Sequence, residues 1–550
     1  MNEYLLVILF IIGITCFFLY LDFSNRQKLK KRIQKEWGQL PKITAKDSED
    51  SLLAAYSFNE DPYDCYIDDL TWSDLDMFEV FQRLNFTYSS IGSESLYKSL
   101  RSYSLNSEKS KKMEELITYF ETHPKEREAI SFQFACLGKR DSNYSQAYLN
   151  GKTTVPFANH GLFLFLGLLP ILSLLAAFLV GPIAIILAIS SLCFNTIFYL
   201  SKKGKLEVEL GTMSYLVQAI SLSVKISKTD SPFSTRLKKA SAPFKSILKH
   251  AVTFRVKNGG EAELMFEMLS ASFLLQFVSY GTVSKKIQAH TTEAKEMWQL
   301  LGDIEIAIAI LNLRKVYEGH WCLPTFSTDG VHGKDVIHPL LSEPVPNPID
   351  WTRSTLITGS NASGKSTYVR AVAINCLFAQ TINTCLAQSL TLKPGHVISS
   401  MGVQDNVIEG DSYFIAELKS LKRLIKLVES GEFCYCFVDE ILKGTNTIER
   451  IAASSSVIAW LTKQNQLTFV ATHDVELPQI LTNDCDNIHF EETVSKENGI
   501  SFDYEVKPGV ATSRNAINLI DAMDFPKEII NESFEKAHYF EENHSWNNNY

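Results

Sequence analysis

Hydrophobic residues recur at helical spacing through the middle of the chain. Between residues 213 and 220, and again between 304 and 311, apolar side chains occupy positions i, i+3, i+4 and i+7. This spacing places them on one face of an α-helix, where they can be buried against a neighbouring element. We therefore expect the chain between the N-terminus and about residue 334 to form an all-α helical core.

Two longer stretches lack this alternation because they are apolar on every side. Residues 4–21 and residues 161–201 contain no charged side chain, and the second is interrupted at Gly181-Pro182. About 20 apolar residues cross a bilayer as a helix, so the pattern predicts one transmembrane anchor within residues 1–22 and a transmembrane helical hairpin at 161–201. A cleavable signal peptide and a buried soluble helix pair are the alternatives for these two stretches.

Positive charge follows both apolar stretches. Lys and Arg cluster at residues 26–35 and again at 202–205. Because such clusters stay on the cytoplasmic side of a membrane, we expect a multi-pass protein of the cell membrane whose remaining parts are cytoplasmic. Membrane lipid is then an expected partner.

Length and composition restrict the class of protein further. At 550 residues, with 45% hydrophobic and 21% charged residues, the chain is long enough for several folded domains. The formal net charge of −9 is not that of a dedicated nucleic-acid-binding protein, although a local basic stretch at 236–257 could face lipid headgroups, nucleic acid or only solvent. The scattered cysteines predict neither a disulfide framework nor a zinc site.

The strongest chemical signal is a phosphate-binding loop after a short apolar strand at residues 355–358. The loop matches G-x-x-x-x-G-K-[ST] in full, and apolar residues at helical spacing follow it. In such a loop Lys365 reaches the β- and γ-phosphates, and the Ser366 hydroxyl is a ligand of Mg²⁺. The residues expected to contact the nucleotide are Gly359, Ser360, Asn361, Ala362, Ser363, Gly364, Lys365 and Ser366.

Two further apolar runs, 433–438 and 467–471, predict buried strands of a parallel sheet. The first ends in Asp439 and Glu440 and the second is followed by His473, so all three would lie at the ligand-binding edge of the sheet. We expect Asp439 to complete the Mg²⁺ site, Glu440 to polarise the attacking water and His473 to orient groups near the γ-phosphate. A surface turn after each strand is the plainer interpretation.

Ser412 precedes another amphipathic helix. Apolar residues of this helix, among them Leu418 and Ile425, alternate at helical spacing with Lys419, Lys422 and Lys426. The Ser412 hydroxyl could cap this helix or, with the amides of the first turn, bind an anion.

These motifs in this order resemble the ATPase domain of the MutS mismatch-repair family. The resemblance rests on Thr358–Arg370, on Gly410–Phe414, on Asp439-Glu-Ile through Gly-Thr-Asn-Thr447, and on Ala471-Thr-His-Asp474. It implies an α/β P-loop NTPase domain of ABC/MutS type joined to the helical core, with ATP and Mg²⁺ as cofactors.

The family pairs two ATPase domains, each completing the other's nucleotide site. The resemblance therefore implies a homodimer in which Ser412 reaches the partner's γ-phosphate and Thr367 adds a phosphate contact, with DNA as a candidate ligand. The family's mismatch-reading domain has no counterpart here, and Phe58-Asn-Glu60 matches its Phe-x-Glu wedge only in letters. Mismatch recognition is not expected.

The predicted organisation is an anchor at 1–22, a helical region at 23–155, the hairpin at 161–201, a second helical region at 202–334 and the ATPase domain at 335–550. The function expected is that of a membrane-anchored, dimeric ATP-hydrolysing switch. A transporter-associated ATPase and a membrane scaffold that binds ATP without hydrolysing it are the alternatives; the hairpin carries no charge that would line a translocation path.

Overall fold

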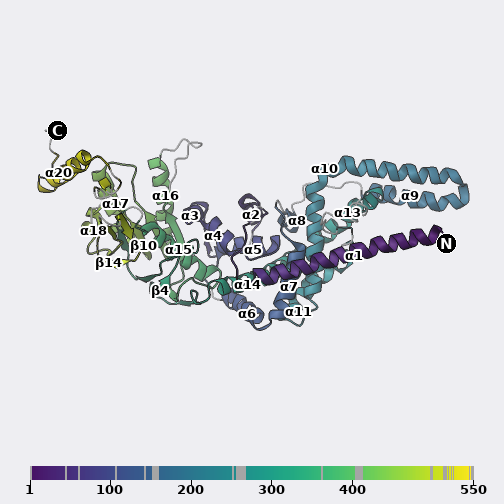
Figure 1. The fold of residues 1–550 in the computed structure, drawn as a ribbon, viewed down its shortest axis with the longest axis horizontal. Coiled ribbons are helices and arrows are strands. Elements are labelled where there is room, and N and C mark those ends of the chain that lie inside the picture. The colour runs from purple at the N-terminus through teal and green to yellow at the C-terminus, as the bar shows by residue number, and fades with distance from the viewer. Residues whose placement is uncertain are drawn as a thin grey trace. The chain divides into compact units, whose positions relative to one another are not determined.

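The contacts within the chain divide it into two compact units. The first comprises Met1–Pro62, Leu84–Lys98 and Lys111–Val316, and the second comprises Tyr63–Arg83, Ser99–Ser110 and Tyr317–Tyr550. A computed structural model describes the chain (Figure 1) apart from residues 1–2, 44–45, 60–61, 106–107, 142–143, 152–159, 251–252, 255–267, 361–362, 403–412, 496–498, 512–516, 518–519, 522, 524, 544 and 547–550.

The regular secondary structure described in the first unit is helical, as the spacing of its apolar positions predicts. Its helices are α1 (Glu3–Glu36), α2 (Glu49–Tyr56), most of α5 (Ser90–Arg101) and of α6 (Glu108–Thr122), α7 (Pro124–Leu137), α8 (Ser145–Leu149), α9 (His160–Val180), α10 (Pro182–Ile226), α11 (Ser234–Ser241), the 3₁₀ helix η1 (Ala242–His250), α13 (Leu275–Gln288) and α14 (Thr291–Val316). Every residue of α14 from Ile304 to Arg314 is buried, so this helix lies in the interior of the unit.

Helices α9 and α10 form an antiparallel hairpin joined at Gly181 (Figure 1). Pro170 lies inside α9 and has no N–H to donate to the carbonyl of Leu166. The side chain of Asn195 on α10 supplies that donor, because its Nδ2 lies 2.8 Å from Leu166 O and 2.9 Å from Ser272 O. The polar side chain thus closes the one gap in the hydrogen bonding of α9 that its proline opens.

The prediction of three transmembrane helices is corrected. Among the described residues one helix, Pro182–Gly204, is long and apolar enough to cross a bilayer. In the other arm of the hairpin, the apolar segment found among the described residues, Gly161–Ala177, is shorter. Most side chains of the expected first span, 4–21, lie outside the described residues.

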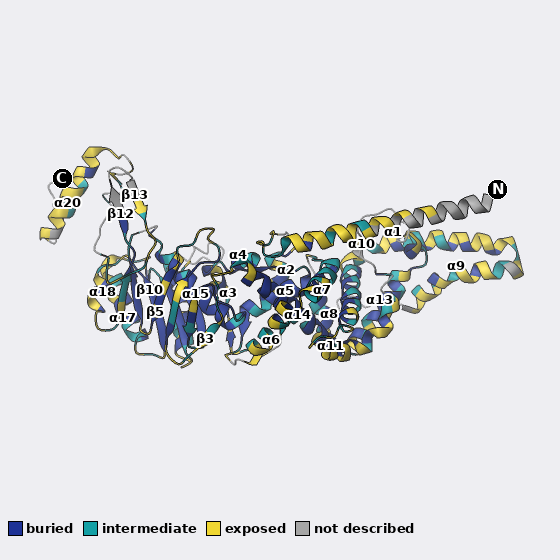
Figure 2. Ribbon diagram, turned by 60° about the horizontal axis from the view of Figure 1, so that its bottom comes forward, coloured by how far each residue is buried: buried dark blue, intermediate teal, exposed yellow. Residues whose placement is uncertain are grey.

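The hairpin surface is unlike that of a soluble core helix. Only 28% of the apolar window in Pro182–Gly204 is buried, and Ile183 and Ile197 are among its exposed side chains. Exposed residues follow both arms in Figure 2. Apolar surface of this extent is normally covered by lipid or by another protein.

The second unit is built on a six-stranded sheet with strand order β14-β11-β6-β10-β9-β8. The strands are β6 (Thr355–Thr358), β8 (His396–Ser400), β9 (Cys434–Asp439), β10 (Gln466–Ala471), β11 (Asp486–His489) and β14 (Lys507–Pro508), and only β14 is antiparallel to its neighbour. The helices are α3 (Asp69–Asp74), α4 (Met77–Leu84), α15 (Lys365–Thr381), α16 (Tyr413–Val428), α17 (Thr447–Leu461), α18 (Glu476–Ile480) and α20 (Lys527–Asn543). The α/β class expected for residues 335–550 is therefore present.

Three smaller sheets complete this unit. They are a four-stranded sheet of β3 (Pro324–Phe326), β7 (Ser389–Leu392), β4 (Val331–Val336) and β5 (Asn347–Trp351), a hairpin of β12 (Glu492–Ser495) and β13 (Gly499–Phe502), and the pair β1 (Cys65–Tyr66) and β2 (Ser102–Tyr103).

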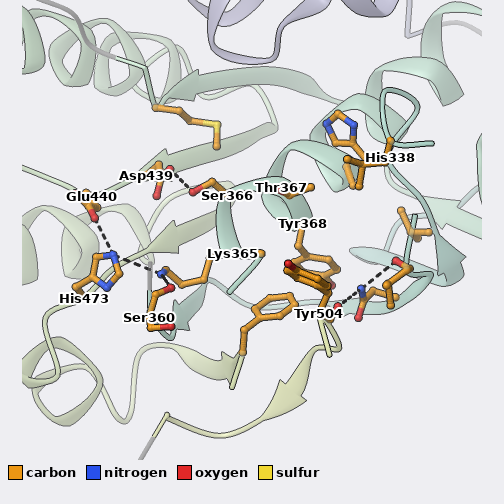
Figure 3. Close-up of a pocket in the computed structure, with 18 of the residues that line it drawn as sticks. His338, Ser360, Lys365, Ser366, Thr367, Tyr368, Asp439, Glu440, His473 and Tyr504 are labelled. Carbon is orange, nitrogen blue, oxygen red and sulfur yellow. Dashed lines mark hydrogen bonds and ion pairs between the residues drawn. The ribbon is translucent and has the colours of Figure 1, made fainter. Parts of the chain in front are cut away.

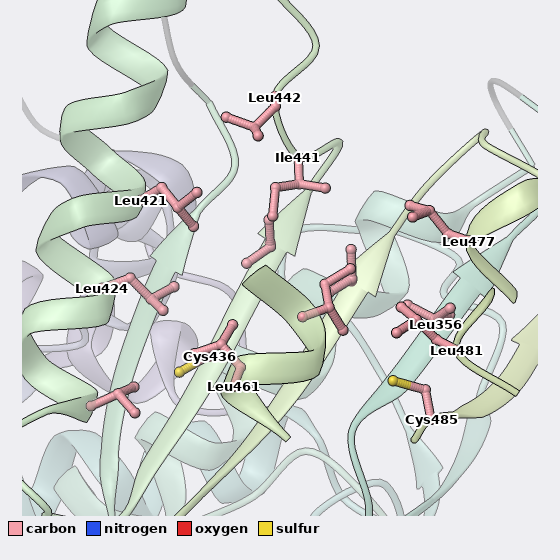
Figure 4. Packing of buried hydrophobic residues seen from close by; sticks show 14 of the residues in the cluster. Leu356, Leu421, Leu424, Cys436, Ile441, Leu442, Leu461, Leu477, Leu481 and Cys485 are labelled. Carbon is pink, nitrogen blue, oxygen red and sulfur yellow. The ribbon is translucent and has the colours of Figure 1, made fainter. Parts of the chain in front are cut away.

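Both faces of the main sheet are covered, so its central strands read as continuous apolar runs. Alternate residues of β9 point to opposite faces. Cys436 faces a cluster that includes Leu424 of α16 and Leu461 of α17 (Figure 4). On the other face Phe437 packs on Trp351 with ring centroids 5.4 Å apart.

A segment far away in the sequence, Tyr63–Arg83, belongs to this unit and packs on its edge strand β8. The buried carboxylate of Asp74 accepts hydrogen bonds from Ser399 Oγ at 2.6 Å, from Met401 N at 2.9 Å and from Gly402 N at 2.8 Å. Asp76 in the same segment forms an ion pair with Arg370 of α15. Part of the N-terminal region is thus fastened directly to the sheet and to the helix that follows the phosphate-binding loop.

Candidate functional site

The phosphate-binding loop joins the fully buried strand β6 to helix α15. Two of its residues must be glycine. Gly359 has a φ of +141° and an added Cβ would lie 2.6 Å from Phe490 O, while Gly364 has a φ of +105°. Asn361 and Ala362 lie outside the described residues. The described part of the loop therefore has the backbone path that the motif requires.

Lys365 is buried at the start of α15, and its amine points back into the loop. Its Nζ donates to Gly359 O and Ser360 O, each at 2.7 Å, and lies 3.4 Å from His473 Nε2 (Figure 3). Burial lowers the pKa of Lys365 to about 8, against the opposing attraction of nearby carboxylates, Asp439 first among them. The amine is thus held in place by groups that phosphate oxygens can replace.

The two expected Mg²⁺ ligands meet at the carboxyl end of β9. Ser366 Oγ donates to Asp439 Oδ2 at 2.6 Å. Burial raises the pKa of Asp439, and this hydrogen bond opposes the rise. A hydroxyl and a carboxylate are hard oxygen donors that suit Mg²⁺, which normally keeps waters and phosphate oxygens as its other ligands. The described residues contain no cluster of three or more His, Cys, Asp or Glu side chains that would hold a metal by themselves.

Glu440 and His473 lie beside Lys365. His473 Nε2 is 2.9 Å from Glu440 Oε1, and Lys443 Nζ contacts the other carboxylate oxygen. The hydrogen bond from His473 is the main reason that the pKa of Glu440 falls to about 2. Glu440 also has a φ of +54°, which is uncommon for a residue with a side chain and is found most often at functional sites. The carboxylate is therefore ionised at neutral pH and oriented by His473 and Lys443.

A cavity of about 660 Å³ opens over these groups. Eight of the predicted residues line it: Ser360, Gly364, Lys365, Ser366, Thr367, Asp439, Glu440 and His473. Its volume suits a nucleotide-sized ligand. Gly359 and Ser363 belong to the loop but do not line the cavity. Ser363 stabilises the loop by donating a hydrogen bond from its Oγ to Ser360 O at 2.8 Å. Ser412, which precedes α16, lies outside the described residues.

Some residues at the site had no assigned role before the structure was known. His338 and Tyr504 line the cavity from β-strand connections distant in the sequence, and the edge of the Tyr504 ring lies 3.2 Å from where a Cβ on Gly364 would be. Glu492 accepts a hydrogen bond from Ser360 Oγ at 2.7 Å, while its other carboxylate oxygen is buried without a partner. The Ile-His-Pro stretch at 337–339 is a sequence feature that could have pointed to His338.

The segment after β10 is also held in place. Arg450 of α17 makes a two-pronged ion pair with Asp474, through its Nε at 3.0 Å and its Nη2 at 2.6 Å. Because Asp474 follows His473 directly, this pair limits how far the imidazole can move from Glu440.

Comparison with known proteins agrees with this geometry. Residues 355–541 match the family model described as MutS domain V. The chain is 25% identical over 272 residues to the DNA mismatch repair protein MutS of Natronomonas pharaonis, covering 48% of this chain and 31% of that protein. It is 27% identical over 285 residues to MutS of Lactobacillus delbrueckii subsp. bulgaricus (49% and 33%) and 32% identical over 216 residues to MSH3 of Yarrowia lipolytica (38% and 21%). The matched part thus spans a third or less of these relatives.

Proposed function

We propose that the chain, whose residues 355–541 match MutS domain V, is a membrane-anchored ATPase of the MutS family which works as a dimeric conformational switch. The observation that carries this proposal is the convergence of Lys365, Ser366, Asp439, Glu440 and His473 on one cavity. These side chains come from three parallel strands or the loops that follow them, which is where open α/β sheets bind ligands.

In the proposed cycle, ATP enters the cavity with its phosphates over the loop. The Lys365 amine exchanges Gly359 O and Ser360 O for phosphate oxygens, and Ser366 and Asp439 are the side chains that would hold Mg²⁺. Bound Mg²⁺ would neutralise charge on the β- and γ-phosphates. Glu440, already ionised and oriented by His473, accepts a hydrogen bond from the attacking water.

Replacement of the carboxylate by an amide tests this assignment. We expect Glu440→Gln to retain ATP binding and to lower the turnover rate about 100-fold or more, since general-base assistance contributes at least that factor. Glu429→Gln, on an exposed residue just after α16, is the matched control and should hydrolyse ATP normally. Binding is measured with a fluorescent nucleotide and turnover by phosphate release; wild-type turnover in Glu440→Gln would remove Glu440 from the mechanism.

Membrane attachment is supported by the apolar hairpin and by the basic residues after it. We expect the full-length protein to stay with the membrane after alkaline carbonate extraction, and we expect the ATPase domain to be accessible to protease only from the cytoplasmic side. Release of the intact protein by carbonate would contradict the anchor, and protection of the ATPase domain from cytoplasmic protease would contradict the orientation.

The relatives are described as DNA mismatch repair proteins, so DNA is the ligand that we propose to test for the helical unit. Duplex and branched DNA should be titrated with the detergent-solubilised protein at several salt concentrations. Contacts to phosphate would weaken with a log–log slope of about 0.9 for each phosphate contacted. Affinity that does not depend on salt would exclude such contacts.

A further inference from the structure

Two cysteines of the second unit face each other across an isolated pair of antiparallel residues. Cys322 N donates to Cys385 O and Cys385 N donates to Cys322 O, each at 2.9 Å. Both side chains are thiols, and the Cys385 thiol hydrogen-bonds the sulfur of Cys322. The pair brings together two segments that lie far apart in the sequence.

The backbone geometry allows a disulfide and also strains it. Residues that exchange both hydrogen bonds in an antiparallel pair have Cα atoms about 5.5 Å apart, which is within the range of disulfides. Their Cβ atoms, at about 5 Å, are farther apart than the roughly 3.8 Å of an average disulfide, so the two chains must move closer. Such strain makes a disulfide easier to reduce.

Cys322 and Cys385 differ in accessibility. Cys322 is half-buried and Cys385 is fully buried. The hydrogen bond from Cys385 lowers the pKa of Cys322, whereas burial raises the pKa of Cys65, Cys376, Cys434, Cys436 and Cys485. Because the thiolate is the nucleophile, Cys322 is the cysteine best suited to react first among those described in the second unit.

We propose that Cys322 and Cys385 form a reversible oxidation site that reacts with small disulfides such as glutathione disulfide. The Cys322 thiolate attacks one sulfur of glutathione disulfide and displaces one glutathione thiolate, which leaves a mixed disulfide on Cys322. Cys385 then loses its proton and attacks the Cys322 sulfur, which releases the second glutathione. Two protein thiols are oxidised to one disulfide, and glutathione disulfide is reduced to two glutathiones.

The position of this site gives the modification a structural consequence. Cys322 follows α14 and leads into β3, and Cys385 follows the turn that ends α15, the helix whose first residue is Lys365. The disulfide would join the segment entering the second unit to the far end of the phosphate-loop helix. The reaction itself does not depend on whether the chain hydrolyses ATP.

The site is tested on the full-length protein, reduced without oxygen and then equilibrated in glutathione buffers of increasing oxidation. After alkylation and trypsin digestion, mass spectrometry should detect a peptide that links Cys322 to Cys385, with two hydrogen atoms lost, and an excess of reduced glutathione should remove the link. Cys434 and Cys436 are the internal control, because residues two apart on one strand point the same way but cannot approach each other. Both should stay alkylated as thiols.

Single substitutions separate the two steps. Cys385→Ser should accumulate the mixed disulfide on Cys322, because no resolving thiol remains. Cys322→Ser should gain no glutathione on Cys385, because Cys385 is buried. If the native wild-type protein keeps both thiols even in glutathione disulfide alone, or stops at the mixed disulfide, the proposal is wrong.

Discussion

At the scale of single residues, the most informative side chain is Lys365. Its amine is buried between carbonyl oxygens and carboxylates, and desolvation leaves its pKa near 8 instead of the usual 10.5. A bound triphosphate would favour the charged amine and raise this pKa again. Nucleotide binding should therefore be coupled to proton uptake in a range of pH that is easily measured.

We expect ATP affinity to fall as the pH rises above about 8, by at most about tenfold per pH unit, because the free protein then loses the Lys365 proton that the complex needs. Titration calorimetry at pH 9 in two buffers of different ionisation enthalpy measures the protons taken up. In Lys365→Arg the guanidinium stays charged, so whatever affinity remains should not change with pH. A wild-type affinity that is constant from pH 7.5 to 9.5 would contradict the coupling.

At the scale of secondary structure, the hairpin depends on one amide. Asn195→Leu leaves Leu166 O and Ser272 O without a donor and should destabilise the hairpin by about 1 kcal/mol. Pro170→Ala in the same background returns a helical N–H to Leu166 O and should recover part of the loss. Unfolding in detergent measures both effects.

Ser191→Ala is the control for the hairpin, because the Ser191 hydroxyl bonds only to Ala188 O of its own helix. Equal losses in Asn195→Leu and Ser191→Ala would show that the bond between helices contributes nothing.

The attachment of α3 to β8 is a second link between elements. Asp74→Ala removes the buried acceptor of three hydrogen bonds and should lower the free energy of unfolding of the second unit by about 2–4 kcal/mol. Asp350→Ala, whose carboxylate is 84% exposed, should change it by less than about 0.5 kcal/mol. Urea unfolding followed by tryptophan fluorescence compares the two, and similar values would contradict the anchoring role.

At the scale of the whole molecule, the proposed dimer shares its active sites. If Ser412 acts on the partner's nucleotide, a Ser412→Ala protomer and a Lys365→Ala protomer together contain one intact site. An equal mixture of the two inactive variants should then recover about a quarter of wild-type turnover, since half of the dimers are mixed and each has one working site. A mixture as inactive as its components would mean that Ser412 serves its own protomer, and an active Ser412→Ala variant would mean that Ser412 has no role.

Among the described residues, fewer helices could cross a membrane than the apolar pattern of the sequence predicts. Composition marks an uncharged stretch, but only the folded length of each helix shows whether it reaches across a bilayer. Among the described residues, Pro182–Gly204 is long and apolar enough to span a bilayer, whereas the apolar segment Gly161–Ala177 is shorter.

The sequence by itself determined those features that depend on neighbours along the chain. The helical stripes, the buried strands and the phosphate-loop motif could all be predicted, because side-chain periodicity and the glycine requirement of the loop are local properties. The apolar runs of the two strands also predicted that Asp439, Glu440 and His473 lie at strand ends. Their chemical roles remain predictions.

The tertiary structure alone decided which distant residues meet. Nothing in the sequence predicts that the two members of such a pair are in contact. The pairs are Asp74 with Met401, Asn195 with Leu166, and Cys322 with Cys385. Each pair exists because folding buries a polar or reactive group, and a buried group is stable only beside a partner that the fold brings to it.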